Sequence, residues 1–271
     1  MNLSSCRMVV EKFAPKLGRL YRSMRDAKML RQPTQTKYGF SLAGDPTILC
    51  EDFESDEKRV FLESMDTHDI VLDIGANVGF YTCLAASRGK HTLAFEPSPR
   101  NLSFLCKNLW ENKFSHVEVF PLGLAGECGL GCIYGFGTSA SFIPGWDHAP
   151  QARFNLVPLT TLDTIAACRF KNKRLFVKMD VEGFELAVLA GAAETLDFNP
   201  KPTWMVEIHL NHQCIPEGIN RRFSEVFEIF WKHGYQCTKP DAARTPVAQA
   251  DVSRWIGNGF VDTGTRDFLF S

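Results

Sequence analysis

Two stretches of this sequence decide the fold: VLDIGANVGFY at residues 71–81 and AFEPSP at residues 94–99. The first is an apolar run that breaks into a loop rich in small residues. The residues of this stretch that we expect to line a ligand site are Asp73, Gly75, Asn77 and Gly79. The second is a short apolar run that ends on an acid, Glu96. This pattern is typical of a strand, turn, helix and strand that together hold a ligand containing adenosine.

The spacing of the loop and the acid indicates which ligand this is. Glu96 follows Gly75 by 21 positions, where a carboxylate can accept hydrogen bonds from both ribose hydroxyls. The loop reads G-x-N-x-G and lacks the third glycine of the dinucleotide pattern, which serves a pyrophosphate. Since S-adenosyl-L-methionine (SAM) has no phosphate, the loop favours SAM over NAD. A Gly/Asn turn alone is common, and the acid at this distance is what makes the ligand interpretation the better one.

Length and composition fit one large α/β domain with a sizeable core. The chain has 271 residues, of which 45% are hydrophobic and 23% are charged. Nine cysteines occur without paired spacing, which predicts free thiols, buried at Cys83 and Cys106, and a reducing compartment. No run approaches the ~20 apolar residues of a membrane span, and the first residues lack the apolar region of a secretory signal. We therefore expect a cytoplasmic protein.

Charge divides the chain into a basic arm and an acidic body. Residues 1–44 contain nine Lys and Arg against two acids, a net charge of +7, and the remainder carries −8. We predict an N-terminal arm at 1–45 and a catalytic domain at 46–271. Residues 6–30 have the apolar spacing of an amphipathic helix, which Pro15 kinks or starts. The arm either docks on the body through its apolar face, which we favour, or contacts an anionic surface such as a membrane, RNA or a partner.

The body alternates predicted strands and helices in βα units. Strands are predicted at 70–74, 92–96, 117–122, 175–180, 204–208, 235–239 and 268–270. Helices are predicted at 56–65, 80–87, 99–112, 162–167, 185–191 and 221–233. Residues 123–155 are Gly-rich and are predicted to form short edge strands or an insertion. The alternation predicts a parallel, doubly wound sheet with helices on both faces, and such sheets bind ligands beyond the carboxyl ends of their strands.

A second group of polar residues follows two later strands. FVKMDVEGFE at 176–185 places Asp180 and Glu182 where one strand ends. The next predicted strand leads into VEIHLNHQ, whose polar side chains are Glu207, His209 and His212. Because the carboxyl ends of parallel strands share one edge, we expect these acids and histidines to converge near the first loop. Acids at a helix start can instead favour the helix dipole, which is the simpler interpretation for Glu185.

In this order, VLDIGANVGFYT, FEPSP, LTTLD, VKMDVEGFELAVLAGA and VEIH resemble the FkbM family of SAM-dependent methyltransferases. The resemblance covers about residues 70–210, and K-x-D-x-E-G-x-E at 178–185 is its most specific motif. It implies a class I (Rossmann-like) methyltransferase fold with a sheet of seven strands, the last of them antiparallel. It also implies O-methylation of a hydroxyl on a sugar or natural-product scaffold.

These observations predict a role for each site residue. The loop from Asp73 through Gly79 should hold the methionine part of SAM, and Glu96 should bind the ribose. An alcohol is a weak nucleophile at neutral pH, so a base or a metal should activate it. The candidates are Asp180, which we rank first, Glu182, Glu207 and His209.

Two questions stay open at this point. Carboxylates that act as bases and carboxylates that bind a divalent ion leave the same pattern, and we expect no required metal. An NAD-dependent oxidoreductase and a non-catalytic SAM-binding module are the alternative functions.

Overall fold

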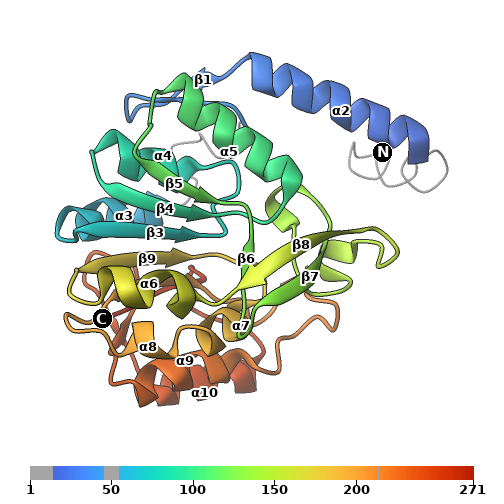
Figure 1. Ribbon diagram of the computed structural model, residues 1–271. Coiled ribbons are helices and arrows are strands. Elements are labelled where there is room, and N and C mark those ends of the chain that lie inside the picture. Colours follow the sequence, from blue (N-terminus) through green and yellow to red (C-terminus); the bar gives the residue numbers. More distant parts are fainter. Residues whose placement is uncertain (1–14, 46–54, 213) are drawn as a thin grey trace.

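The computed structural model describes residues 15–45, 55–212 and 214–271. Its centre is a mixed sheet of eight strands (Figure 1). Across the sheet the strands are β12 (Pro246–Val247), β11 (Cys237–Thr238), β13 (Asp267–Phe270), β10 (Thr203–Glu207), β9 (Leu175–Met179), β3 (Ile70–Ile74), β4 (His91–Phe95) and β5 (Val117–Phe120).

Strand order reverses at β3, and this reversal positions the ligand site. β3 pairs in parallel with β4 on one side and with β9 on the other, so the chain leaves the centre in both directions. β4 and β5, and likewise β9 and β10, continue the parallel arrangement. The loops after β3, β4, β9 and β10 therefore meet at one edge of the sheet, where doubly wound proteins bind ligands.

The predicted doubly wound, class I architecture is confirmed. β13, the last strand, lies antiparallel to β10 and separates it from β11, as the resemblance implied. The sheet has eight strands where seven were expected. The additional strand, β12, contributes only two residues beside β11 at the edge, too few to show any alternation in the sequence.

Helices cover both faces of the sheet, and the alternation of each strand sorts its side chains between them. Val71 faces one layer and Leu72 the other, and both are fully buried. One core contains side chains of α3 (Ser55–Asp66), α4 (Phe80–Ser87) and α5 (Pro99–Glu111). The other contains side chains of α6 (Leu162–Phe170), α7 (Glu185–Ala190), α8 (Ala193–Leu196), α9 (Phe223–Lys232) and α10 (Gln249–Asn258).

The Gly-rich segment was predicted to form short edge strands or an insertion; it is an insertion, and with the residues up to Thr160 it forms a second, smaller sheet. Its strands are β6 (Gly123–Leu124), β7 (Gly129–Tyr134) and β8 (Phe154–Thr160), with β8 in the middle. Two 3₁₀ turns lie between β7 and β8, at η2 (Gly137–Ser139) and η3 (Trp146–His148). This insertion lies over the carboxyl edge of the large sheet (Figure 1).

Before the body, the chain forms helix α2 (Pro15–Arg31) and a hairpin of β1 (Thr34–Gln35) and β2 (Ser41–Leu42). The described helix starts at Pro15; the part of the prediction at 6–14 lies outside the described residues. The helix does contact the body, as we favoured, but the expected apolar face does not make the contact. Leu20, Tyr21 and Met24 are exposed, and the helix contacts the body through other side chains.

The hairpin behaves differently from the helix. Phe40, Leu42 and Ala43 are buried in the core that also holds α4 and α5. The side chain of Asn108 on α5 accepts from Ala43 N–H and donates to its carbonyl, at 2.7 and 2.9 Å. The division of the chain at residue 45 stays a prediction, but the last residues before it are packed as core.

Three further points correct or complete the sequence-based picture. Helix α10 was not predicted, because only Val252 and Trp255 of its ten residues are buried and its apolar stripe is narrow. Cys106 is exposed where a buried thiol was expected, whereas Cys83 is buried. Within the described ranges, no helix is long and apolar enough to cross a membrane.

Candidate functional site

The first loop is shaped by close packing against the strand beside it. Gly75 has φ +86°, and a Cβ there would lie 1.8 Å from the carbonyl oxygen of Asp180. Gly79 has φ +89°, and a Cβ there would lie 2.5 Å from Cδ1 of Leu105. Asn77 also has a positive φ, 54°, a conformation that Asn tolerates better than most residues. Glycine is therefore needed here for space, and the predicted proximity of Asp180 to this loop is confirmed.

Asp73 lies at the end of β3 and is almost fully buried. Burial raises the pKa of its carboxyl. The hydrogen bond donated by the Thr82 hydroxyl and the charge of the Lys178 ammonium both act to lower this pKa, but burial outweighs them. The residue ties the start of the loop to helix α4.

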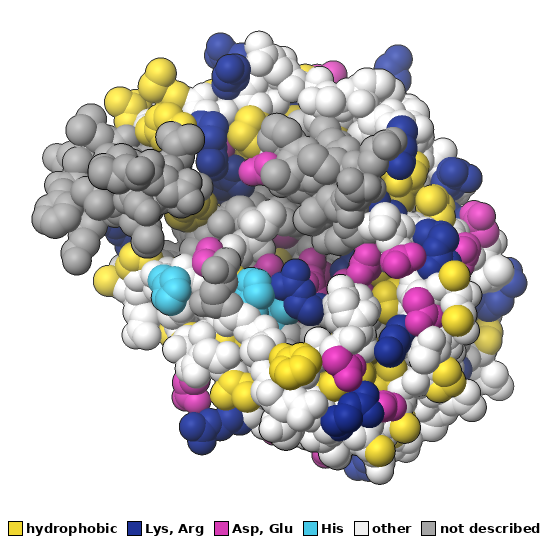
Figure 2. Space-filling view, turned by 180° about the vertical axis from the view of Figure 1, so that it is seen from behind, with side chains coloured by type: hydrophobic (Ala, Val, Ile, Leu, Met, Phe, Trp, Pro, Cys, Tyr) yellow, Lys and Arg dark blue, Asp and Glu magenta, His cyan; other side chains and the backbone are white. Residues whose placement is uncertain are grey.

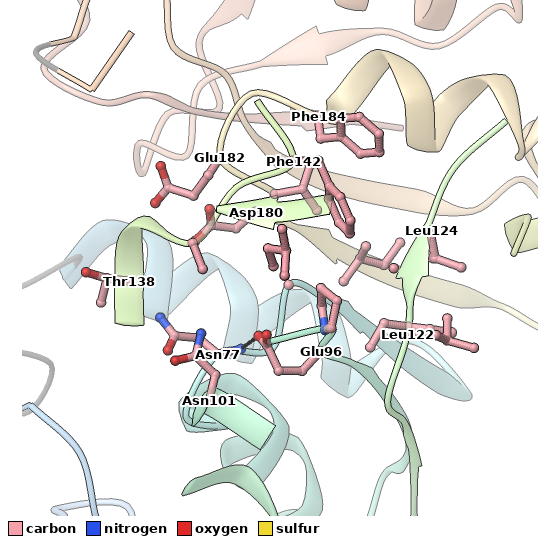
Figure 3. A pocket seen from close by; sticks show the side chains of 18 of the residues that line it. Asn77, Glu96, Asn101, Leu122, Leu124, Thr138, Phe142, Asp180, Glu182 and Phe184 are labelled. Carbon is pink, nitrogen blue, oxygen red and sulfur yellow. Dashed lines mark hydrogen bonds between the residues drawn. The ribbon is translucent and has the colours of Figure 1, made fainter. Parts of the chain in front are cut away.

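Glu96 follows β4 and reaches back to the first loop. Its two carboxylate oxygens accept from the backbone N–H groups of Asn77 and Ser98, each at 2.7 Å. Burial raises the pKa of this carboxyl to about 8, although both hydrogen bonds favour the charged form. The side chain is 4% exposed and lines a pocket. Figure 3 shows Glu96 and Asn101 on one side of that pocket and Asp180 and Glu182 on the other.

This first pocket is mainly apolar beyond its polar end. Its apolar side chains come from β3, β4, the small sheet and the loop before α7: Ile74, Phe95, Leu122, Leu124, Ile133, Phe142, Val181 and Phe184. The polar end has Glu96, Asn101 and Asn77, whose side-chain oxygen is buried without a hydrogen-bond partner among the described residues. A flat, apolar group flanked by hydroxyls matches such a lining.

A second pocket continues on the far side of Asp180 and carries the predicted acids and histidines. Five residues line both pockets: Gly75, Asn77, Thr138, Asp180 and Glu182. The second pocket adds Asp73, Asp147, Lys178, Glu207, His209, His212 and Arg266. Acidic, basic and histidine side chains lie beside one another on the face shown in Figure 2. The expected convergence of the two constellations is therefore present.

Asp180 lies where the two pockets meet. Its side chain is about one third exposed, and its carboxylate lies 4.0 Å from the ammonium of Lys178. Lys178 is buried, and its ammonium also lies 3.3 Å from the carboxylate of Asp267 on β13. A buried ammonium beside two carboxylates stabilises their charged forms.

Glu207 and His209 form a buried pair at the end of β10. The ring nitrogen Nε2 of His209 lies 3.0 Å from Oε1 of Glu207. Burial alone would raise the pKa of Glu207 and lower that of His209, but the contact between them outweighs it. The pKa of Glu207 is lowered to about 2 and the pKa of His209 is raised. Arg266 Nη1, which can only donate, also lies 3.1 Å from this nitrogen. Because one ring nitrogen cannot donate and accept at once, only one of the two contacts is a hydrogen bond, and the raised pKa of His209 favours Nε2–H donation to Glu207.

Glu182 is held by two residues of the insertion that the sequence did not single out. The indole N–H of Trp146 donates to its carboxylate at 2.8 Å, and the hydroxyl of Ser141 donates to its carbonyl at 2.7 Å. Its backbone is left-handed, with φ 53°, a conformation that costs energy in a residue with a side chain. Burial and the nearby charge of Glu207 raise the pKa of Glu182 to about 7.

Trp146 and Ser141 lie more than thirty residues before Glu182, so only the folded insertion brings them there. The sequence offered one signal, a single Trp in a Gly-rich segment, and it was not enough to assign a partner.

Glu185, in contrast, lies at the start of helix α7, as the simpler interpretation expected. Its carboxylate accepts from Gly183 N–H at 2.9 Å at the start of α7. Among the described residues, no group of three His, Cys, Asp or Glu side chains is arranged to hold a metal ion.

Comparison with known proteins identifies the family. Residues 73–237 match the family described as the Methyltransferase FkbM domain, which is more than half of this chain. The chain belongs to the FkbM methyltransferase family. Membership confirms the resemblance and decides for a methyltransferase over the oxidoreductase that the first βαβ unit left open.

Individual relatives of this FkbM methyltransferase are distant. The hexuronic acid methyltransferase AglP of Haloferax volcanii is 27% identical over 175 residues, covering 64% of this chain and 68% of AglP. A solved FkbM methyltransferase of Methylobacillus flagellatus is 18% identical with a TM-score of 0.45. That match covers 75% of this chain and 44% of the solved one, so this chain spans less than half of that protein. Fibrillarin of Aeropyrum pernix, solved with SAM, is 8% identical with a TM-score of 0.41, covering 79% and 73% of the two chains.

Proposed function

We propose that this chain transfers the methyl group of SAM to a hydroxyl oxygen of a sugar or natural-product-like acceptor. One observation carries the proposal: Asp180 lies in the wall that two pockets with different linings share. The first pocket has an apolar lining and a buried acid, Glu96, at its polar end. The second is acidic and contains every candidate base. A methyl donor and an acceptor in adjoining pockets would meet beside Asp180, as an in-line displacement requires.

The side chains that line the first pocket can make the hydrogen bonds that SAM requires. Glu96 uses one lone pair of each oxygen for Asn77 and Ser98, which leaves each oxygen able to accept from a ribose hydroxyl. The side-chain oxygen of Asn77, which has no hydrogen-bond partner among the described residues, is a further acceptor at the polar end of the pocket. SAM supplies a methyl group on a positively charged sulfur. Asp73, Asp180 and Glu182 would stabilise that charge.

Asp180 is the best-placed base for the acceptor. Its carboxylate is accessible from the second pocket, and Lys178 favours its charged form. In the proposed step, Asp180 accepts the hydroxyl proton while the oxygen takes the methyl group, and S-adenosylhomocysteine leaves as a neutral thioether. The Glu207–His209 pair is the alternative base. The name of AglP, a hexuronic acid methyltransferase, supports a sugar as acceptor. Hexuronic acids therefore belong among the acceptors to be tested.

The test is turnover with labelled SAM against a panel of sugars, hexuronic acids and small hydroxylated metabolites. Asp180→Asn should keep SAM binding in calorimetry and lower methyl transfer on the order of 10²–10⁴-fold. Asp69→Asn is the matched control, since Asp69 precedes β3 at the opposite edge of the sheet and pairs with Arg174. Near-normal turnover of Asp180→Asn would move the role to Glu207 or His209. SAM binding without turnover on any acceptor would support the non-catalytic module instead.

A further inference from the structure

Exposed hydrophobic side chains are concentrated on one region of the described chain. Ten large hydrophobic side chains are exposed in the parts that the structure describes, and seven of them belong to α2, β7, β8 or the second residue after β7. These seven are Leu20, Tyr21, Met24, Leu130, Phe136, Phe154 and Leu156. α2 and the β7–β8 hairpin protrude on the same side of the molecule (Figure 1). Apolar patches of this kind on a folded protein mark interaction sites.

Helix α2 is held in one rotational orientation by polar contacts. Asp26 accepts two hydrogen bonds from the guanidinium of Arg100 on α5, at 2.6 and 2.7 Å. One turn earlier, the guanidinium of Arg22 lies 4.8 Å from the ring centre of Phe136. Met29 and Leu30 pack against the core at the end of the helix. The face that contains Arg22, Asp26 and Met29 is therefore the inner one.

The outer face of α2 combines apolar and basic side chains. Leu20, Tyr21 and Met24 are 58%, 64% and 66% exposed, and Lys28 and Arg31 are exposed on the turns that follow. Figure 2 shows hydrophobic side chains gathered at the upper left, where α2 runs. The helix sequence contains six Lys and Arg and one acid, Asp26, which Arg100 neutralises.

The outer face of the β7–β8 hairpin extends this surface. The register pairs Leu130 with Pro158, Cys132 with Leu156 and Tyr134 with Phe154. These six side chains share one face of the hairpin, because residues two apart on a strand point the same way. The opposite face is buried through Ile133 and Val157. The hairpin thus presents an uncharged, apolar face next to the basic helix, and Arg22 on Phe136 joins the two elements.

We propose that α2 and the outer face of the β7–β8 hairpin form a surface that binds an anionic lipid bilayer in its headgroup layer. Basic residues attract anionic headgroups, and aliphatic side chains gain from entering hydrocarbon. A single-stranded RNA site would use basic and aromatic side chains and would gain little from Leu20, Met24, Leu130 and Leu156. Gly137 and Thr138, which follow Phe136, line the first pocket, so docking would bring the site close to the membrane.

The test is binding of the full-length protein to vesicles. Vesicles of phosphatidylcholine and phosphatidylserine should retain the protein on flotation, and vesicles of phosphatidylcholine alone should not. Binding should fall steeply at 1 M salt, where the Debye length is about 3 Å. Lys28→Gln with Arg31→Gln should weaken binding on the order of 30-fold, as two headgroup-facing charges predict. Leu20→Ser with Met24→Ser should also weaken it.

The matched control is Ile256→Ser with Phe260→Ser, which removes two exposed hydrophobic side chains at α10, on the other side of the large sheet. This control should bind vesicles normally, and all variants should retain their thermal unfolding temperature and SAM affinity. Equal weakening by the control would overturn the proposal. So would full-strength binding of both α2 variants, binding to neutral vesicles alone, or binding of RNA with no binding to either vesicle.

Discussion

At the scale of single residues, Gly75 tests how closely the two halves of the site are packed. A Cβ at Gly75 would lie 1.8 Å from the carbonyl of Asp180, which belongs to the strand connection beside it. Gly75→Ala should therefore destabilise the protein on the order of 3 kcal/mol or more, from overlap and the left-handed backbone together. Gly89→Ala is the control. Gly89 has φ +72° but no atom within 4 Å of a new Cβ, so it should lose only about 1–2 kcal/mol in chemical denaturation. Equal losses would mean that the backbone conformation, and not the contact with Asp180, requires glycine.

Glu96 gives a prediction for the cofactor. Glu96→Ala removes an acceptor for the ribose hydroxyls and should cost on the order of 1.5–3 kcal/mol of SAM affinity in calorimetry. Glu118→Ala, an acid on neighbouring β5 that pairs with Arg169 outside both pockets, should bind SAM normally. Unchanged SAM affinity in Glu96→Ala would contradict the ribose assignment.

The same carboxyl predicts a pH dependence. Its pKa in the free protein is raised to about 8, so it is mostly protonated at neutral pH. Two ribose hydroxyls favour the charged form, and SAM binding should therefore release a proton. Affinity should rise with pH up to about 8, by at most about tenfold per pH unit, and level off above it. Glu96→Gln should bind SAM with no such rise. A wild-type affinity that is flat over this range would show that the ribose does not contact an ionised Glu96.

At the scale of elements, the turn η3 decides how Glu182 is presented to the site. Trp146 N–H favours the charged form of a carboxyl whose pKa burial raises to about 7. Trp146→Phe keeps the ring but loses this hydrogen bond, so the pKa of Glu182 should rise further. If catalysis needs ionised Glu182, the acidic limb of the kcat profile should move to higher pH by about one pH unit or more. Trp255→Phe, which removes the indole hydrogen bond from Trp255 on α10 to Asp262, should leave the profile in place. If the acidic limb of the kcat profile is unchanged in Trp146→Phe, the role of Trp146 is purely structural.

At the scale of the whole molecule, the boundary of the N-terminal arm can be located by truncation. Deleting residues 1–44 removes Phe40 and Leu42 from the core, each worth about 1.5–3 kcal/mol of burial, together with both hydrogen bonds of Asn108 to Ala43. That protein should melt at a much lower temperature. Deleting residues 1–32 keeps the hairpin and should retain SAM affinity, because both pockets are lined only by residues from Asp73 onward. Similar melting of both truncations would show that the hairpin adds little to the core.

The sequence by itself determined the architecture and the positions of the candidate site residues. Apolar runs of four to six residues are strands because both faces of a parallel sheet are buried, and the loops after them can only meet at one edge. That reasoning placed Asp180, Glu182, Glu207 and His209 together with the loop at Gly75 without any coordinates. Each of these features depends on a short stretch of sequence and not on contacts between distant segments.

Only the tertiary structure decided what depends on contacts between distant segments. The orientation of α2 follows from Asp26 meeting Arg100, an ion pair between residues 74 positions apart, which reversed the expected apolar docking. The hydrogen bond from Trp146 to Glu182, and the wall that the two pockets share near Asp180, depend on a Gly-rich insertion that meets the loop after β9 only in the folded protein. Burial also changes the acids themselves, since the pKa of Glu96 depends on which side chains exclude water around it. The sequence states which groups are present, and packing sets their partners, exposure and charge.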